Sequence, residues 1–160
     1  MQTFDQLLQR IEQEIGKLQF DFYGSDVRQA IPAALGLEVF HNFTLLHDDL
    51  MDEADKRRNK PTVHKVWNAN AAILSGDAML IAAYRLMGQV KVDLLKPIFD
   101  LFTQTALEIC GGQQYDMEFE SRLDVTEEEY IEMIRLKTAV LLACALKMGA
   151  LIGGAPQAAV

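Results

Sequence analysis

An apolar segment that runs directly into a cluster of carboxylates constrains this chain more than any other feature. Asp48, Asp49 and Asp52 form the cluster. The large apolar side chains before it are Leu35, Leu37, Val39, Phe40, Phe43, Leu45 and Leu46. On an α-helix, Asp48 and Asp52 are four residues apart and lie on one face, while Asp49 lies about 100° around the axis. The sequence therefore predicts a buried helix that ends in carboxylates.

Clustered carboxylates repel one another and destabilise a helix end, unless a cation binds there. Mg²⁺ takes oxygen ligands, keeps several waters and shares one or two protein carboxylates with substrate phosphates. Arg57 and Arg58 follow directly and can bind phosphates in a bidentate manner. The pattern indicates a metal–diphosphate site. The alternative is a solvated helix end whose arginines form surface ion pairs.

Helical periodicity continues through the rest of the chain, and no alternating strand pattern competes with it. The fold class predicted is therefore all-α. In the helix from Val63 to Met87, core candidates include Ile73, Leu74 and Ile81. The expected helices are Phe4 to Phe20, Asp26 to the acidic cluster, Val63 to Met87, Asp93 to Phe119, and Thr126 to Ile152.

Local signals define several helix ends. Ser25 or Asp26 can cap the helix that leads to the acidic cluster. Pro32 is acceptable only near the first turn of that helix or at a kink. Between residues 56 and 61 we expect a polar loop, in which Asn59 can adopt the left-handed conformation. Thr126 and Glu129 form a capping box, and Gly153 with the next glycine ends the last helix.

Polar residues inside two apolar segments are further site candidates. Gln113 and Asp116 are three residues apart on one helix face, so both side chains can point into one cavity. Lys137 and Thr138 interrupt the apolar pattern of the last helix. The alternatives are a core hydrogen bond for Gln113 and a lysine that extends to solvent for Lys137. His47 and His64 lack carboxylate or cysteine companions at metal-ligand spacing, so they are interpreted as structural residues or as outer partners of the site residues.

Composition excludes several classes of protein. A length of 160 residues predicts one domain, and half of these residues are hydrophobic. The net charge of −8 argues against nucleic-acid binding. No run of residues is long and apolar enough for a membrane span, so we expect no integral membrane protein. Cys110 and Cys144 lie in apolar contexts and are interpreted as reduced core cysteines of a cytoplasmic protein.

Five ordered motifs carry a resemblance to a known family. They are Glu38–His41 with Asp48–Asp52, Arg57–His64, Ser75–Asp77, Gly112–Asp116 and Lys137–Ala139. From about Val27 to Ala155 the chain resembles the trans-polyprenyl diphosphate synthases of the farnesyl and geranylgeranyl type. The resemblance implies a helical bundle of the isoprenoid synthase type with a central cavity, about half of it represented here. It also implies a homodimer.

The resemblance implies a prenyl transfer reaction with Mg²⁺ as cofactor. An allylic diphosphate ionises, the double bond of isopentenyl diphosphate attacks the carbocation, and a proton is lost. The catalytic residues it implies are Asp48, Asp52 and Lys137. The substrate-binding residues are Arg57 for the allylic diphosphate, Arg58 for isopentenyl diphosphate, and Gln113, Lys137 and Thr138. The metal-binding residues are Asp48, Asp52 and Asp116, with Asp49 as an outer partner.

Product length is expected to depend on Phe43 and Thr44, about one turn before Asp48 on the same helix. A growing prenyl chain would descend past these positions. In short-chain family members an aromatic side chain blocks that path, so the resemblance favours farnesyl or geranylgeranyl diphosphate as the product.

The sequence departs from the family in three places. The segment from Phe20 to Val27 lacks the family's basic motif, Asn59 replaces a glycine, and Val160 precedes the second aspartate-rich motif. We therefore expect residues 1–160 to be a single but incomplete synthase domain. The alternative is a truncated relative, such as a non-catalytic regulatory subunit. An intact mass well above 18.0 kDa would favour the incomplete domain.

Overall fold

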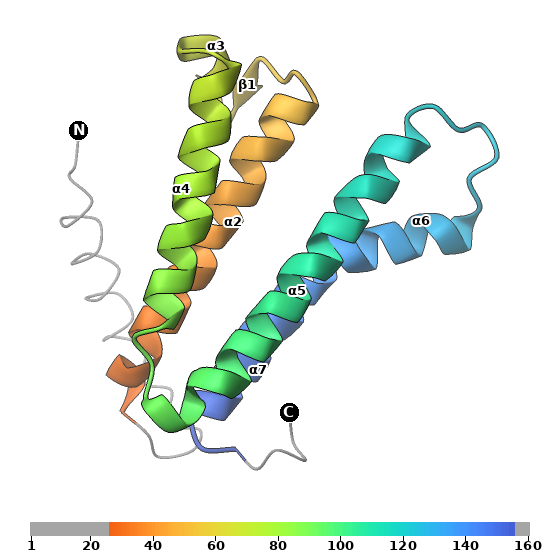
Figure 1. Ribbon diagram of the computed structural model, residues 1–160. Helices are drawn as coiled ribbons and strands as arrows, with labels where there is room; N and C mark the ends of the chain where they lie inside the picture. Colours follow the sequence, from red (N-terminus) through yellow and green to blue (C-terminus); the bar gives the residue numbers. More distant parts are fainter. Residues whose placement is uncertain (1–25, 156–160) are drawn as a thin grey trace. The chain divides into compact units, whose positions relative to one another are not determined.

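The computed structural model describes residues 26–155, and these residues form α-helices joined by short connections (Figure 1). They divide into two compact units, residues 30–90 and residues 91–155. The all-α fold class is confirmed. The helix expected from Phe4 to Phe20 lies outside the described residues, as does most of the segment that lacks the basic motif.

A 3₁₀ turn, η1 (Val27–Ala30), leads into α2 (Ile31–Met51). The Asp26 carboxylate accepts the backbone N–H of Arg28 at 3.0 Å, so Asp26 caps this turn. The helix α2 itself begins after Ala30 without a side-chain cap, so the expected cap of that helix is wrong for Asp26. Pro32 lies in the first turn of α2, where its missing N–H has no intrahelical partner to lose. The carboxylate cluster lies at the end of this 21-residue helix and is therefore positioned by a rigid element.

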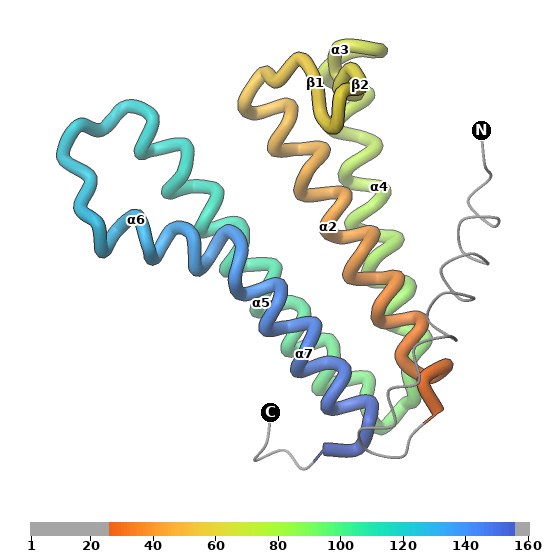
Figure 2. Tube along the Cα trace, turned by 180° about the vertical axis from the view of Figure 1, so that it is seen from behind, coloured from red at the N-terminus to blue at the C-terminus, as the bar shows by residue number. Residues whose placement is uncertain are grey.

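The first unit is built on the pairing of α2 with α4 (Ala69–Met87), which lie side by side in both views (Figures 1 and 2). Small residues of α4 allow a close approach: the Gly36 backbone of α2 lies against Met87 and the Ala83 carbonyl. The buried apolar side chains of the pair are Ala33, Leu35, Phe40, Ala72, Ala83 and Met87. The pair therefore packs through a face of mainly small side chains on α4.

The larger apolar residues of α4 do not form this core. Ile73, Leu74 and Ile81 are exposed, so the expectation that they lie in the core is wrong for the described residues. The helical period is right, but α4 turns its small-residue face towards α2 and leaves these side chains on another face. Periodicity identifies an apolar face without saying which partner covers it.

The helix expected from Val63 to Met87 is two helices, α3 (Val63–Val66) and α4. The backbone leaves the helical region at Trp67, and Asn68 then caps α4 by accepting the N–H of Ala71 at 2.8 Å. Asparagine is a favoured cap residue because its side-chain oxygen satisfies an otherwise unpaired donor. α4 ends at Met87, as expected, and Gly88 is its C-cap residue.

The second unit contains α5 (Val92–Phe119), α6 (Glu127–Ile134), the π-helical segment η2 (Arg135–Ala139) and α7 (Val140–Ile152). The capping box of Thr126 and Glu129 is present at the start of α6. The buried apolar side chains of this unit are Ile98, Phe102, Ile109, Met133, Val140, Cys144, Met148 and Ile152. They show that α5 packs along η2 and α7.

The last helix was expected to run without interruption, and η2 corrects that expectation. A π-helix adds a residue to the turn, which rotates the side chains that follow it and is frequent at functional sites. Lys137 and Thr138 lie inside this segment. The irregular turn therefore coincides with the polar interruption in the sequence.

The two cysteines differ, although both were expected in the core. Cys144 is buried, and burial raises the pKa of its thiol, whereas Cys110 is exposed on α5. Brief treatment of the folded chain with iodoacetamide at mildly alkaline pH is expected to add one adduct, on Cys110. A raised pKa and lack of access both slow Cys144. Peptide mass spectrometry reads the sites, and equal labelling of both thiols would contradict the packing described.

Among residues 26–155, no helix has the length and apolar character needed to cross a membrane.

Candidate diphosphate-binding site

The acidic cluster lies at the end of α2, where the helix is closed by a residue with positive φ. Glu53 has φ of 50°, and the N–H of Ala54 then returns to the carbonyl of Asp49 at 3.0 Å. The N–H of Asp52 still bonds to the carbonyl of Asp48 at 2.9 Å. Helical register therefore reaches Asp52, and Asp48 and Asp52 share one face.

The polar loop after α2 is a small antiparallel hairpin of β1 (Lys56–Arg57) and β2 (Lys60–Pro61). Its two turn residues, Arg58 and Asn59, have φ of 51° and 64°, as a type I′ turn requires. The left-handed conformation expected for Asn59 is confirmed. The hairpin itself was not expected, because two-residue strands leave no periodic signal.

Thr62 ties this hairpin to the end of α2. Its side chain is buried, and its Oγ1 donates to the carbonyl of Ala54 at 2.6 Å. Its backbone N–H donates to the carbonyl of Asp55 at 3.2 Å. These two bonds fold the hairpin back over the helix end, which brings the arginines near the carboxylates.

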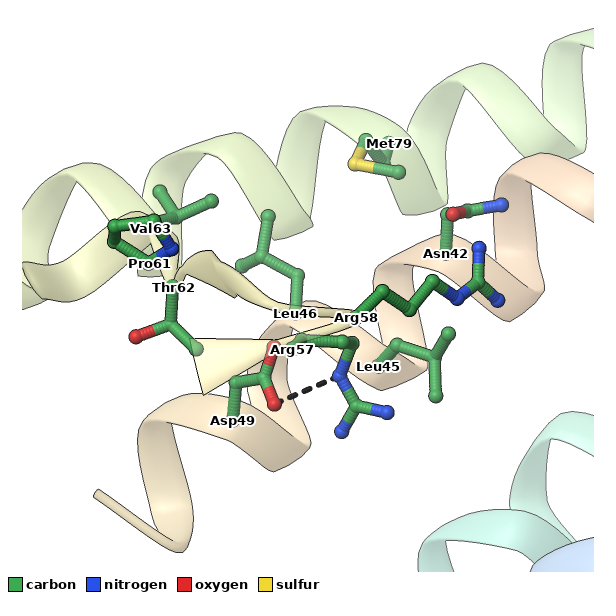
Figure 3. A pocket seen from close by; sticks show the side chains of 10 residues that line it. All are labelled: Asn42, Leu45, Leu46, Asp49, Arg57, Arg58, Pro61, Thr62, Val63 and Met79. Carbon is green, nitrogen blue, oxygen red and sulfur yellow. Dashed lines mark hydrogen bonds and ion pairs between the residues drawn. The ribbon is translucent and has the colours of Figure 1, made fainter. Parts of the chain in front are cut away.

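Arg57 binds both of the adjacent carboxylates (Figure 3 shows the bond to Asp49). Its Nε donates to Asp49 at 2.8 Å, and its Nη2 donates to Asp48 at 3.1 Å. The side chains of Asp48 and Asp49 are 18% and 11% exposed, so the pairs are partly shielded from water. The guanidinium offsets the repulsion between the two carboxylates.

Arg58 leaves the hairpin in a different direction, towards Asn42 (Figure 3). It lines a pocket of about 250 Å³ between α2, the hairpin and α4. The pocket residues are Asn42, Leu45, Leu46, Asp49, Arg57, Arg58, Pro61, Thr62, Val63 and Met79. The pocket thus presents two guanidinium groups and one buried carboxylate to a small anionic molecule.

The donors at the end of α2 fit magnesium. Asp48 and Asp52 offer hard oxygen atoms from one helix face, and Asp49 lies beside them. Among residues 26–155, no three histidine, cysteine or acidic side chains already converge into a metal-binding group. Asp48 and Asp52 are compatible with an ion that uses one or two protein carboxylates and completes its shell with water and phosphate oxygens.

The second unit brings together two other predicted site residues. Lys137 on η2 donates to the Asp116 carboxylate on α5 at 2.5 Å, and their side chains are 27% and 32% exposed. Lys137 therefore does not simply extend to solvent. The ion pair holds the ammonium group in a defined place on this unit.

Gly112 permits that contact, and sequence reasoning did not single it out for this role. A Cβ atom at Gly112 would overlap the backbone of Lys137 and lie 2.8 Å from the Leu136 carbonyl carbon. Only glycine allows α5 and the π-helical turn to approach this closely. Gly111, its neighbour, has open space where a Cβ would be. The signal in the sequence that could have indicated this role is the position of Gly112 at the start of the polar motif Gly112–Asp116.

The remaining predicted residues are placed as follows. Gln113 is half-buried on α5, and Thr138 is exposed on η2. Thr44 donates its hydroxyl to the His41 carbonyl at 2.8 Å, within α2. Phe43 is half-buried on α2, with its ring between those of Phe40 and His47.

The described residues thus form an all-α fold with paired carboxylates and arginines at the end of α2. The sequence pattern of the polyprenyl synthetase family matches residues 6–160, and the chain belongs to that family. The resemblance seen in the motifs is thus confirmed over nearly the whole chain.

Named relatives agree with this assignment. The geranylgeranyl diphosphate synthase of Methanosarcina mazei is 47% identical over 134 residues, which are 82% of this chain and 41% of the relative. The (2E,6E)-farnesyl diphosphate synthase of Mycobacterium tuberculosis is 40% identical over 134 residues, 84% of this chain and 37% of the relative. The chain spans less than half the length of these curated relatives.

A solved structure has the same fold. A crystal structure of a geranylgeranyl pyrophosphate synthase superposes with a TM-score of 0.82 at 51% identity. The superposition covers 95% of this chain and 44% of the other.

Proposed function

We propose that this chain takes part in prenyl transfer, in which an allylic diphosphate condenses with isopentenyl diphosphate to give farnesyl or geranylgeranyl diphosphate. The observation that carries the proposal is Arg57 bound to both Asp48 and Asp49 beside a pocket lined by Arg58. Family membership and the synthase names of the relatives support it.

In this proposal each residue of the first unit has a distinct task. Bound Mg²⁺ would neutralise the leaving diphosphate, and Asp48, Asp49 and Asp52 would hold it. Arg57 holds the allylic diphosphate through guanidinium N–H groups that are not bonded to Asp48 or Asp49. Arg58 holds isopentenyl diphosphate in the pocket. Both guanidinium groups remain charged throughout, so they stabilise the developing negative charge without a proton transfer.

The second unit supplies Lys137, Gln113 and Thr138 as further substrate contacts. Lys137 stabilises the departing diphosphate with its fixed positive charge, while Asp116 orients the lysine and takes part in metal binding. The ion pair between Lys137 and Asp116 supports this assignment, because it holds the ammonium group in a defined place before substrate binds.

The test is a product assay on the intact polypeptide that contains residues 1–160. The chain is incubated with Mg²⁺, geranyl diphosphate and labelled isopentenyl diphosphate, and the dephosphorylated products are separated by chromatography. Labelled farnesol or geranylgeraniol is the expected result. A chain that makes nothing alone but changes the products of a full-length synthase would be a regulatory subunit, which is the second candidate. No effect in either assay would contradict both.

Product length gives a separate prediction. Phe43 lies on α2 one turn before the carboxylates, and its ring is expected to limit the growing chain. Phe43→Ala is expected to shift the products towards chains longer by at least one five-carbon unit, because the truncated side chain opens the path. Chromatography of the same dephosphorylated products measures the shift, and products no longer than those of wild type would contradict the role.

We also propose a homodimer in the cytoplasm. Three exposed apolar side chains on α4 support an interface between two copies of the chain, because exposed apolar groups on one helix favour burial against a partner. They are Ile73, Leu74 and Ile81. The unpaired state of Cys110 and Cys144 fits a reducing compartment. Sedimentation velocity measures the oligomeric state, and a monomer at micromolar concentration would contradict the dimer.

A further inference from the structure

Three rings lie in sequence along one face of α2. Phe40 and Phe43 have ring centroids 5.6 Å apart, and Phe43 and His47 have centroids 4.7 Å apart with an edge-to-face angle of 67°. Phe40 is 2% exposed and cannot move without disturbing the core. Phe43 is therefore held by a fixed ring on one side and by His47 on the other.

His47 is in turn held by α4. Its Nε2 lies 3.3 Å from the carbonyl of Ile73, and since a carbonyl only accepts, Nε2 carries the proton in this contact. The backbone of Gly76 lies directly against the imidazole: a Cβ there would overlap the ring and lie 2.9 Å from Cε1. The buried Gly76 thus gives the imidazole a place that no other residue would leave open.

We propose that His47 and Gly76 set product chain length by fixing the ring of Phe43. This inference rests on the proposed function and deepens it, because it names the residues that position the chain-length residue. His47 touches no substrate in this scheme. It transmits the position of α4 to Phe43, and Gly76 makes that contact possible.

Product distributions of single and double variants test the idea. His47→Ala is expected to lengthen the products by about one five-carbon unit, because the Phe43 ring loses its outer support. Phe43→Ala lengthens them at least as much, and His47→Ala with Phe43→Ala gives the same products as Phe43→Ala alone. This non-additivity is the sign that one residue acts through the other. The length distribution is independent of overall rate, so a purely structural loss of activity does not imitate it.

Gly76→Ala provides the second arm, with Gly149→Ala as its matched control, because a Cβ at Gly149 meets nothing within 4 Å. Gly76→Ala is expected to change the products and remove the nuclear Overhauser contacts between the rings of His47 and Phe43. Gly149→Ala leaves both unchanged. Adding His47→Ala to Gly76→Ala is expected to restore thermal stability, since the overlap disappears, while the products remain long.

Two results would overturn the inference. One is an unchanged product distribution in His47→Ala while Phe43→Ala lengthens the products. The other is an intact contact between the two rings in Gly76→Ala. If wild type forms no product in either the direct or the mixed assay, the proposed function fails, and the inference fails with it. The product assay on wild type therefore distinguishes failure of the proposed function from failure of the inference about His47 and Gly76.

Discussion

Asp48→Asn is expected to lower the rate of prenyl transfer by about 100-fold or more, a loss typical of removing one charge-stabilising group from an active site. The amide keeps the shape of the side chain, and its oxygen can still accept from Arg57, which lies 3.1 Å away in wild type. The substitution therefore removes one negative charge with little change in packing. The expected signature is a loss in kcat together with a higher requirement for Mg²⁺.

Asp100→Asn is the matched control for this experiment. Asp100 lies on α5 and pairs with Lys96 one turn earlier at the surface. Exposed pairs of this kind contribute about 0.3–0.5 kcal/mol at most, so activity and stability should change little. Steady-state kinetics with a Mg²⁺ titration compare the two variants. If the kcat of Asp48→Asn is within about threefold of the wild-type value, the Asp48 carboxylate is not part of the metal–diphosphate site.

Gly112→Ala is expected to destabilise the second unit by about 1–3 kcal/mol, the usual cost of overpacking a close contact. The added Cβ meets the backbone of Leu136 and Lys137, which cannot rotate away as a flexible side chain would. Gly111→Ala, one residue earlier, has open space and is expected to stabilise by about 0.5–1 kcal/mol, because alanine loses less conformational freedom in a helix. Urea denaturation measures both.

The two glycine variants also distinguish a loss of stability from a displacement of the Lys137 side chain. In Gly112→Ala the backbone of η2 must shift, so the contact of Lys137 with Asp116 should lengthen and kcat should fall even at temperatures where the variant is folded. Gly111→Ala leaves the ion pair in place. Changes of the same sign and size in the two variants would mean that the π-helical turn does not depend on close approach at Gly112.

The fold class and most helix ends were predictable because local chemistry decides them. Asn59 in the left-handed region, the capping box at Thr126 and the position of Pro32 each follow from one residue and its neighbours. The end of α4 before Gly88 is likewise a local feature. These features need no knowledge of what the helices contact.

Tertiary packing decides the features that the sequence did not predict. The break at Asn68 looks like continued helix in the pattern of apolar residues, and the π-helical turn at Lys137 depends on the close approach of Gly112. The exposure of Ile73 and Leu74 has the same origin: the period locates their face, but α2 packs against the opposite, smaller side chains.

The helix face shared by the candidate site residues was predictable from their spacing, whereas their contacts were predictable only in part. The spacing of Asp48 and Asp52 placed both on one helix face. The bond from Arg57 to Asp49 was not predictable, because it needs the turn at Arg58 and the anchor at Thr62 to fold the hairpin back. The pairing of Lys137 with Asp116 joins residues 21 positions apart and depends on helix packing.

Diphosphate binding measured by isothermal titration calorimetry, with and without Mg²⁺, tests most directly whether the end of α2 is a metal–diphosphate site. Inorganic diphosphate is the probe, and the 160-residue chain is compared with Asp48→Asn and with Asp100→Asn. The account predicts binding to wild type and Asp100→Asn only when Mg²⁺ is present, and at least about tenfold weaker binding to Asp48→Asn. Binding that ignores Mg²⁺, or that is equal in all three proteins, would contradict it.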